Sequence, residues 1–75
     1  MTAVDVVFRY GAPPEESDLR ALQGVREVYG IRRIGFDEAA RTVRVEYDAT
    51  RLSASDVAAL LRDAGLDLRE QVQLV

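Results

Sequence analysis

The stretch TVRVEYDATRLSASDVAALLRDAGLDL, residues 42–68, decides the fold, because its apolar side chains change spacing partway along. The first seven residues alternate apolar and polar side chains, which is the pattern of a strand with one buried face. We expect this strand to point Val43, Val45 and Tyr47 inward and Thr42, Arg44 and Glu46 outward.

Residues 52–65 of the same stretch predict a helix. Ser53 and Asp56 have the spacing of a capping box, with aspartate in place of the usual glutamate. Gly65 follows as a C-terminal cap. The apolar residues have i, i+3, i+4, i+7 spacing, so they form one buried stripe. This stripe consists of Val57, Leu60, Leu61 and Ala64.

The N-terminal part of the chain predicts a strand followed by a helix. Residues 4–10 alternate, and Gly11 ends the strand. Residues 13–24 predict a short helix, because proline is tolerated near a first helical position and Gly24 is a candidate C-terminal cap. The inward side chains of the strand are Val4, Val6, Phe8 and Tyr10, and the outward ones are Asp5, Val7 and Arg9.

Two more strands complete the pattern. Residues 25–36 are apolar and β-branched but alternate imperfectly, which predicts a strand with a bulge at Gly30. Residues 37–41 predict a hairpin loop. Residues 66–75 alternate again, with Leu66, Leu68, Val72 and Leu74 on one parity.

The predicted order is therefore strand, helix, strand, strand, helix, strand over one domain, residues 1–75. Two helices covering one face of a four-stranded antiparallel sheet form the ferredoxin-like βαββαβ sandwich, an α+β fold. Right-handed crossovers give the strand order 4-1-3-2. The expected core consists of Val6, Phe8, Leu22, Val45, Tyr47, Val57, Leu60, Leu61 and Leu68.

The composition excludes several classes of function. The chain has no cysteine and no histidine, and all ten basic residues are arginine. The usual zinc and copper ligands and most nucleophiles and near-neutral general bases are therefore missing. We expect no enzymatic activity and no cofactor. A net charge of -3 argues against nucleic-acid binding. No stretch predicts a membrane span or a signal peptide, so we expect a cytoplasmic protein.

Three segments, LQGVREV, VRVEYD and LSASDVAALLRDAGLDL, closely resemble the heavy-metal-associated domain of copper chaperones, mercury-binding proteins and metal-pumping ATPases. The functional motif of that family is Gly-Met-x-Cys-x-x-Cys at the end of the first strand. Gly11 matches its glycine, but Ala12, Pro13, Pro14 and Glu15 follow it. The resemblance thus implies a scaffold that lacks the thiolate metal site.

Carboxylates after the first strand offer an alternative metal site. Glu15, Glu16 and Asp18 could replace the thiolates and bind a hard cation, which would make the protein a metal carrier or regulator. The other interpretation is that acidic residues favour the positive end of the helix macrodipole. Consecutive helical positions point in different directions, so we favour this second interpretation.

Two further functions use the open face of such a sheet or its first loop. RNA-recognition domains stack bases on outward aromatic residues, but the outward positions here are mainly charged and suggest ion pairs between strands one and three. VVFRYG faintly resembles the arginine-bearing first loop of acylphosphatases, whose mechanism also needs an asparagine that this chain lacks. We expect Arg9 to be a solvated strand residue.

The remaining expectation is a protein-interaction module. Arg26, Arg32, Arg33 and Arg41 on the second strand and its hairpin could bind an acidic partner or could protect a sheet edge from aggregation. The last strand carries no charge after Glu70, so its edge is less protected. We expect a protein partner or a homodimer to pair along that edge, near Gln73 and Val75.

Overall fold

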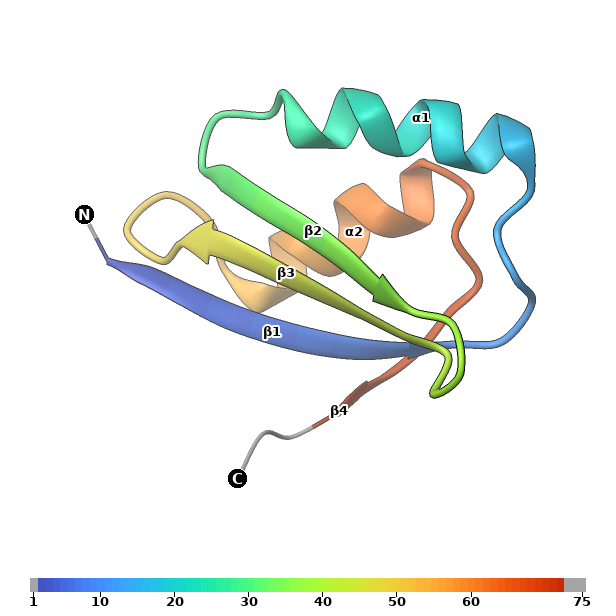
Figure 1. The fold of residues 1–75 in the computed structure, drawn as a ribbon. Helices are drawn as coiled ribbons and strands as arrows, with labels where there is room; N and C mark the ends of the chain where they lie inside the picture. Colours follow the sequence, from blue (N-terminus) through green and yellow to red (C-terminus); the bar gives the residue numbers. More distant parts are fainter. Residues whose placement is uncertain (1, 73–75) are drawn as a thin grey trace.

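The computed structural model describes residues 2–72 and has the expected ferredoxin-like fold (Figure 1). A four-stranded antiparallel sheet in the order β2-β3-β1-β4 is covered on one face by two helices. This strand order is the predicted 4-1-3-2. The elements are β1 (Ala3–Tyr10), α1 (Glu16–Arg26), β2 (Ile31–Asp37), β3 (Thr42–Asp48), α2 (Ala54–Asp63) and β4 (Leu68–Val72).

The central strands β1 and β3 supply the middle of the core. They pair in register from Ala3 opposite Asp48 to Arg9 opposite Thr42. Alternation then places Val6, Val43 and Val45 against the helices, as predicted, and each is at most 4% exposed. Val7 differs from the prediction, because it lies on the open face and is nevertheless buried. Its neighbours across the strands, Arg44 and Val72, flank it on that face.

Helix α1 begins and ends later than the sequence predicts. It starts at Glu16 and continues through Gly24 to Arg26, so Gly24 is a helical residue and the C-terminal cap is Glu27. The buried side chains are Leu22 and Val25, three residues apart. In the helical conformation the Val25 side chain packs in the core, and this burial favours continuing the helix past Gly24.

Strand β2 starts at Ile31, because residues 25–30 finish the helix and form a turn. Gly30 has φ +104°, a conformation that favours glycine, and belongs to this turn rather than to a bulge. The bulge lies after it, between Ile31 and Arg33. The extra residue shifts the alternation, so Ile31 and Ile34 are both buried although their parities differ.

Helix α2 confirms the predicted capping box. The Ser53 hydroxyl accepts from the Asp56 backbone N–H at 3.1 Å, and the Asp56 carboxylate accepts from the Ser53 N–H at 2.9 Å. Val57 and Leu61 are fully buried. Leu60, which we predict as a core residue, is only partly buried and packs against the core. Ala58 of the same helix is buried, although it is not among the predicted core residues.

Strand β4 carries a second irregularity. Tyr10 is opposite Leu68, whereas Phe8 is opposite Gln71, so β4 has one more residue than β1 over this interval. This bulge moves Val72 to the open face, where it pairs with Val7. The prediction that Leu68 and Val72 share the inward face is therefore wrong.

Candidate functional site

The segment after β1, where the family resemblance would place metal ligands, is occupied by the start of α1. Glu15 is the N-cap, and the Glu15 backbone N–H donates a hydrogen bond to the Asp18 carboxylate at 2.9 Å. The other Asp18 oxygen lies against Gly65, at the C-terminal end of α2. The Glu16 carboxylate accepts from Arg20, one helical turn later, at 3.3 Å. The Asp18 carboxylate thus caps the start of α1, whereas the Glu16 carboxylate contacts Arg20 on the helix surface.

The loop itself is held by hydrogen bonds from two other parts of the chain. The Gly11 N–H donates to the Asp67 carbonyl and the Ala12 N–H to the Asp67 carboxylate, both at 2.9 Å. Arg41 donates from its guanidinium to the Gly11 carbonyl at 3.0 Å. The Ala12 N–H, followed by Arg69, holds the pKa of Asp67 below its ordinary value against the opposing effect of desolvation. These contacts fix the loop backbone with protein partners alone.

A groove of about 310 Å³ lies beside this loop. It is mainly apolar: the Tyr10 and Phe36 rings meet edge to face inside it, with centroids 5.8 Å apart. Burial, followed by the nearby Glu38 carboxylate, raises the pKa of Tyr10. The groove is lined by Tyr10, Pro13, Pro14, Leu19, Phe36, Glu38 and Arg41. Such a lining can accept an apolar group but offers no set of soft-metal ligands.

Within residues 2–72, no group of three or more Asp, Glu, His or Cys side chains lies close enough together to hold a metal ion. Glu15, Glu16 and Asp18 are among these side chains and form no such group. The geometry of the described chain thus gives no support to the carboxylate alternative, since calcium needs about six or more oxygen ligands.

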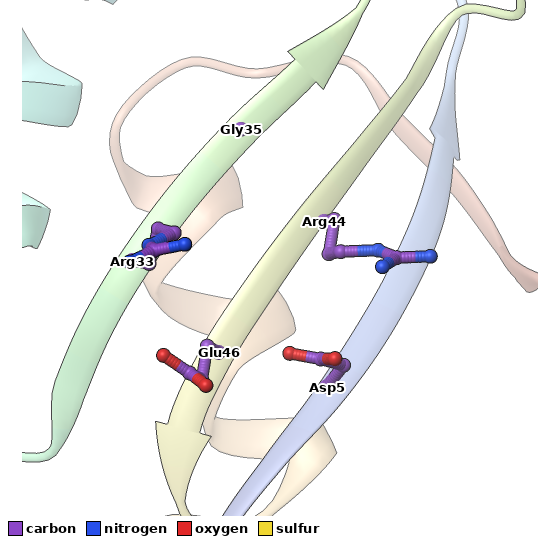
Figure 2. Close-up of a pocket in the computed structure, with 5 residues that line it drawn as sticks. All are labelled: Asp5, Arg33, Gly35, Arg44 and Glu46. Atoms are coloured by element: carbon purple, nitrogen blue, oxygen red, sulfur yellow. The ribbon is translucent and has the colours of Figure 1, made fainter.

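The open sheet face is polar and shallow (Figure 2). Asp5, Arg33, Arg44 and Glu46 line a hollow on this face, and Gly35, which has no side chain, lies at one end of it. Glu46 stands opposite Arg33 on one side and opposite Asp5 on the other. In the described part of the chain, these four charged groups form no ion pair with one another.

An ion pair on this face joins Arg9 of β1 to Glu70 of β4, at 3.1 Å. The sequence predicts ion pairs between β1 and β3, but the observed pair joins β1 to β4. Arg9 is therefore paired with Glu70 and is not a purely solvated residue. Phe8, Tyr10 and Tyr47 are buried on the helix side, so the open face offers no β1 or β3 aromatic ring for base stacking.

The four arginines predicted as one docking surface lie in different places. Arg26 is in the last turn of α1 rather than on β2. Arg33 is on the open face, and Arg41 binds the loop after β1. Arg26 and Arg32 line one groove at the far end of the sheet. Gln73 and Val75, the expected edge contacts, lie outside the described residues.

Sequence reasoning missed one contact at that far end. The Arg51 guanidinium lies over the Tyr29 ring, 4.3 Å from its centroid, and Tyr29 is 70% exposed. Arg51 precedes α2 and Tyr29 follows α1, so no local spacing joins them. The available signal was a tyrosine beside Gly30 that did not fit the predicted alternation.

Asp48 is the buried charged residue at the end of β3. Its Oδ1 atom accepts from the Thr50 hydroxyl at 2.7 Å, from the Thr50 N–H at 3.0 Å and from the Thr2 N–H at 3.4 Å. The Thr50 hydrogen bonds hold the pKa of Asp48 below its ordinary value. The ionised carboxylate therefore stabilises the turn between β3 and α2.

This shift predicts a pH dependence. A carboxyl group with a lowered folded pKa stabilises the fold above its unfolded pKa of about 3.9, and this stabilisation is lost as the pH falls through the folded value. Asp48→Asn should therefore destabilise the protein by a constant amount from pH 7 to 5, and the difference from the unsubstituted protein should shrink below pH 4. Urea unfolding at each pH measures it. A difference that stays constant down to pH 3 would contradict the assignment.

Comparisons with known proteins show a similarity of fold. No family model matches the chain, and no curated protein matches significantly. Among solved structures, the chain is similar to the yeast copper transporter domain Ccc2a, determined in apo and Cu(I)-loaded states, with a TM-score of 0.71 and 16% identity. The match covers 92% of this chain and 94% of that domain. Residues 2–72 contain no helix long and apolar enough to cross a membrane. The chain thus shares its ferredoxin-like fold with a copper transporter domain.

Proposed function

We propose that this chain is a non-enzymatic protein-interaction module on a heavy-metal-associated-type scaffold without a thiolate metal site. It binds a protein partner as an accessory subunit, or a second copy of itself, through the outer edge of β4. The absence of cysteine, histidine and lysine from the sequence supports a role without catalysis or soft-metal transfer. The fold shared with a small copper transporter domain supports the choice of scaffold.

The observation that carries the proposal is the contrast between the two sheet edges. Both edge strands contain a bulge, but β2 also exposes two consecutive arginines, Arg32 and Arg33, and such charges deter edge pairing. On β4, Arg69 pairs with Asp67 at 3.1 Å and Glu70 pairs with Arg9, so both charges are directed to groups of the same chain. Gln71 and Val72 follow without charge. This edge is the less protected template for an added strand.

Self-association through β4 predicts a dimer that a charge on this edge disrupts. Light scattering should give about twice the 8.3 kDa chain mass. Gln71→Lys should shift the mass toward the monomer, because a lysine on an edge strand opposes pairing. Gln23→Lys is the matched control, since Gln23 is an exposed residue of α1 away from the edge. A monomer before substitution, or a dimer that survives Gln71→Lys, would exclude self-pairing here and leave only a different partner.

The alternative of a metal carrier gives a separate prediction. Because the sequence has no thiol or imidazole, the chain should not bind Cu(I), Zn²⁺ or Hg²⁺ tightly. Competition titrations with micromolar protein, together with metal analysis of the protein as isolated, measure this. Stoichiometric binding of any of these ions would contradict the proposed lack of a soft-metal site.

A further inference from the structure

The end of the molecule opposite the loop after β1 carries an exposed cluster of arginines around one tyrosine. We define the basic end as Arg26, Tyr29, Arg32 and Arg51. Three of these residues line one groove of about 290 Å³, and Arg51 stacks on one of the three, Tyr29, from the neighbouring turn. We propose that the basic end is a docking surface for an acidic segment of a protein partner.

The backbone that presents this surface is fixed before any partner binds. The turn from α1 to β2 and the turn from β3 to α2 lie at the same end of the sheet (Figure 1). The Asp48 N–H donates to the Gly30 carbonyl at 2.7 Å and joins the two turns. Gly30 also packs closely on Leu52, where a side chain would come within 3.0 Å. A rigid surface loses less entropy on binding, so its contacts contribute more to affinity.

The stacking of Arg51 suits it to bind a carboxylate. A guanidinium that uses its flat face against an aromatic ring keeps its in-plane N–H groups available. Those donors match both oxygens of one carboxylate. Tyr29, at 70% exposure, supplies apolar area beside them. Tyrosine and arginine are the residue types that contribute most often to binding hot spots.

The charge around the basic end favours an anion. Arg26 and Arg32 line the groove together with the exposed acid Glu27, and Arg51 adds a third arginine through its stacking on Tyr29. Asp48 also lines the groove, but it is buried and bonded to Thr2 and Thr50. Arg26 and Arg51 form no ion pair within residues 2–72. With Arg51 included, the basic end and its groove thus place three arginines against two acids, Glu27 and the buried Asp48, on a chain whose net charge is -3.

The negative net charge of the whole chain favours a protein partner over a nucleic acid. A nucleic acid carries its charge along its whole length and would meet the acidic remainder of this chain. A short acidic peptide segment places two or three carboxylates at the basic end and needs no other contact. This inference rests on the proposed interaction function and names a second surface, distant from the β4 edge at residues 71 and 72.

The test uses nuclear magnetic resonance of the labelled full chain with a synthetic acidic peptide, acetyl-GEEFEELG-amide, at up to millimolar concentration. The largest chemical-shift changes should occur at the backbone amides of Tyr29, Gly30 and Arg51. A peptide with glutamine in place of every glutamate should cause none of them. Shifts that are absent at millimolar peptide, or that centre elsewhere, would overturn the proposal.

Arginine substitutions test the location. The double variant Arg26→Gln and Arg51→Gln should weaken the peptide about tenfold, since each exposed charge pair contributes modestly. The matched control, Arg44→Gln with Arg62→Gln, removes the same charge from two exposed residues elsewhere and should bind as the unsubstituted chain does. Equal weakening by both variants would show a general charge effect and reject a defined site.

Two more measurements separate the remaining outcomes. A single-stranded RNA oligonucleotide that binds more tightly than the peptide, through the same arginines, would assign the basic end to nucleic acid and contradict the proposal. Gln71→Lys should leave peptide binding unchanged. A chain that is monomeric before substitution, or whose dimer survives Gln71→Lys, and that still binds the peptide would therefore reject edge pairing alone. A dimer that Gln71→Lys disrupts, in a chain that does not bind the peptide, would reject the basic end alone.

Discussion

Leu61→Ala is expected to lower the free energy of unfolding by about 3–5 kcal/mol, the upper part of the range for large-to-small core substitutions. Leu61 is completely inaccessible to solvent and is among the largest such side chains in residues 2–72. It lies in the layer between α2 and the sheet, so the cavity cannot be filled without moving an element. Small domains have total stabilities near the lower end of roughly 5–15 kcal/mol. This one substitution should therefore remove much of the stability.

Leu60→Ala is the matched comparison, because the same atoms are deleted one position away. Leu60 is only partly buried, so the loss should be about 1–2 kcal/mol. Urea unfolding followed by circular dichroism measures both variants. A larger loss at Leu60 than at Leu61 would mean that α2 is rotated relative to the sheet.

Gly65→Ala is expected to destabilise the protein by about 2–3 kcal/mol. Gly65 has φ +102°, and a side chain in this left-handed region costs about 1–2 kcal/mol. A Cβ there would also collide with the Asp18 carboxylate. Asp18 would have to move, and its hydrogen bond to the Glu15 N–H, which caps α1, would weaken. Thermal and urea unfolding should both show the loss.

Gly24→Ala provides the control with the opposite sign. Gly24 lies inside α1, and a Cβ added there would meet no other atom within 4 Å. Alanine favours a helix over glycine by about 1 kcal/mol, so this variant should gain about 0.5–1 kcal/mol. A loss at Gly65→Ala no larger than the roughly 1–2 kcal/mol of the left-handed backbone would mean that the contact with Asp18 adds nothing to stability.

Most of the fold could be predicted because the patterns at β1, β3 and α2 are local and strong. Alternation identified Val43 and Val45, and the capping box placed the start of α2. The end of α1 was misplaced because glycine usually follows a helix, whereas here the burial of Val25 holds the helix through Gly24. Tertiary packing thus outweighed a local preference of about 1 kcal/mol.

The bulges explain the remaining errors. An extra residue in β2 or β4 reverses the side-chain parity after it, and the sequence shows only an imperfect alternation. Val72 therefore lies on the open face instead of the predicted inward face, and the bulge of β2 lies after Gly30 instead of at it. The contact of Arg51 with Tyr29 could not be predicted, because it depends on how two turns from separate helix–strand connections meet.

The strand order has a consequence for synthesis. β1 is translated before the other described elements, and its two neighbours, β3 and β4, come later, with β4 the last of them. While the ribosome adds the intervening residues, β1 has open hydrogen-bonding groups on both sides. The helices can form early, but the sheet must close over long intervals of chain, which slows folding relative to a helical bundle. Nascent chains therefore pass through a stage in which their future central strand is the aggregation-prone one.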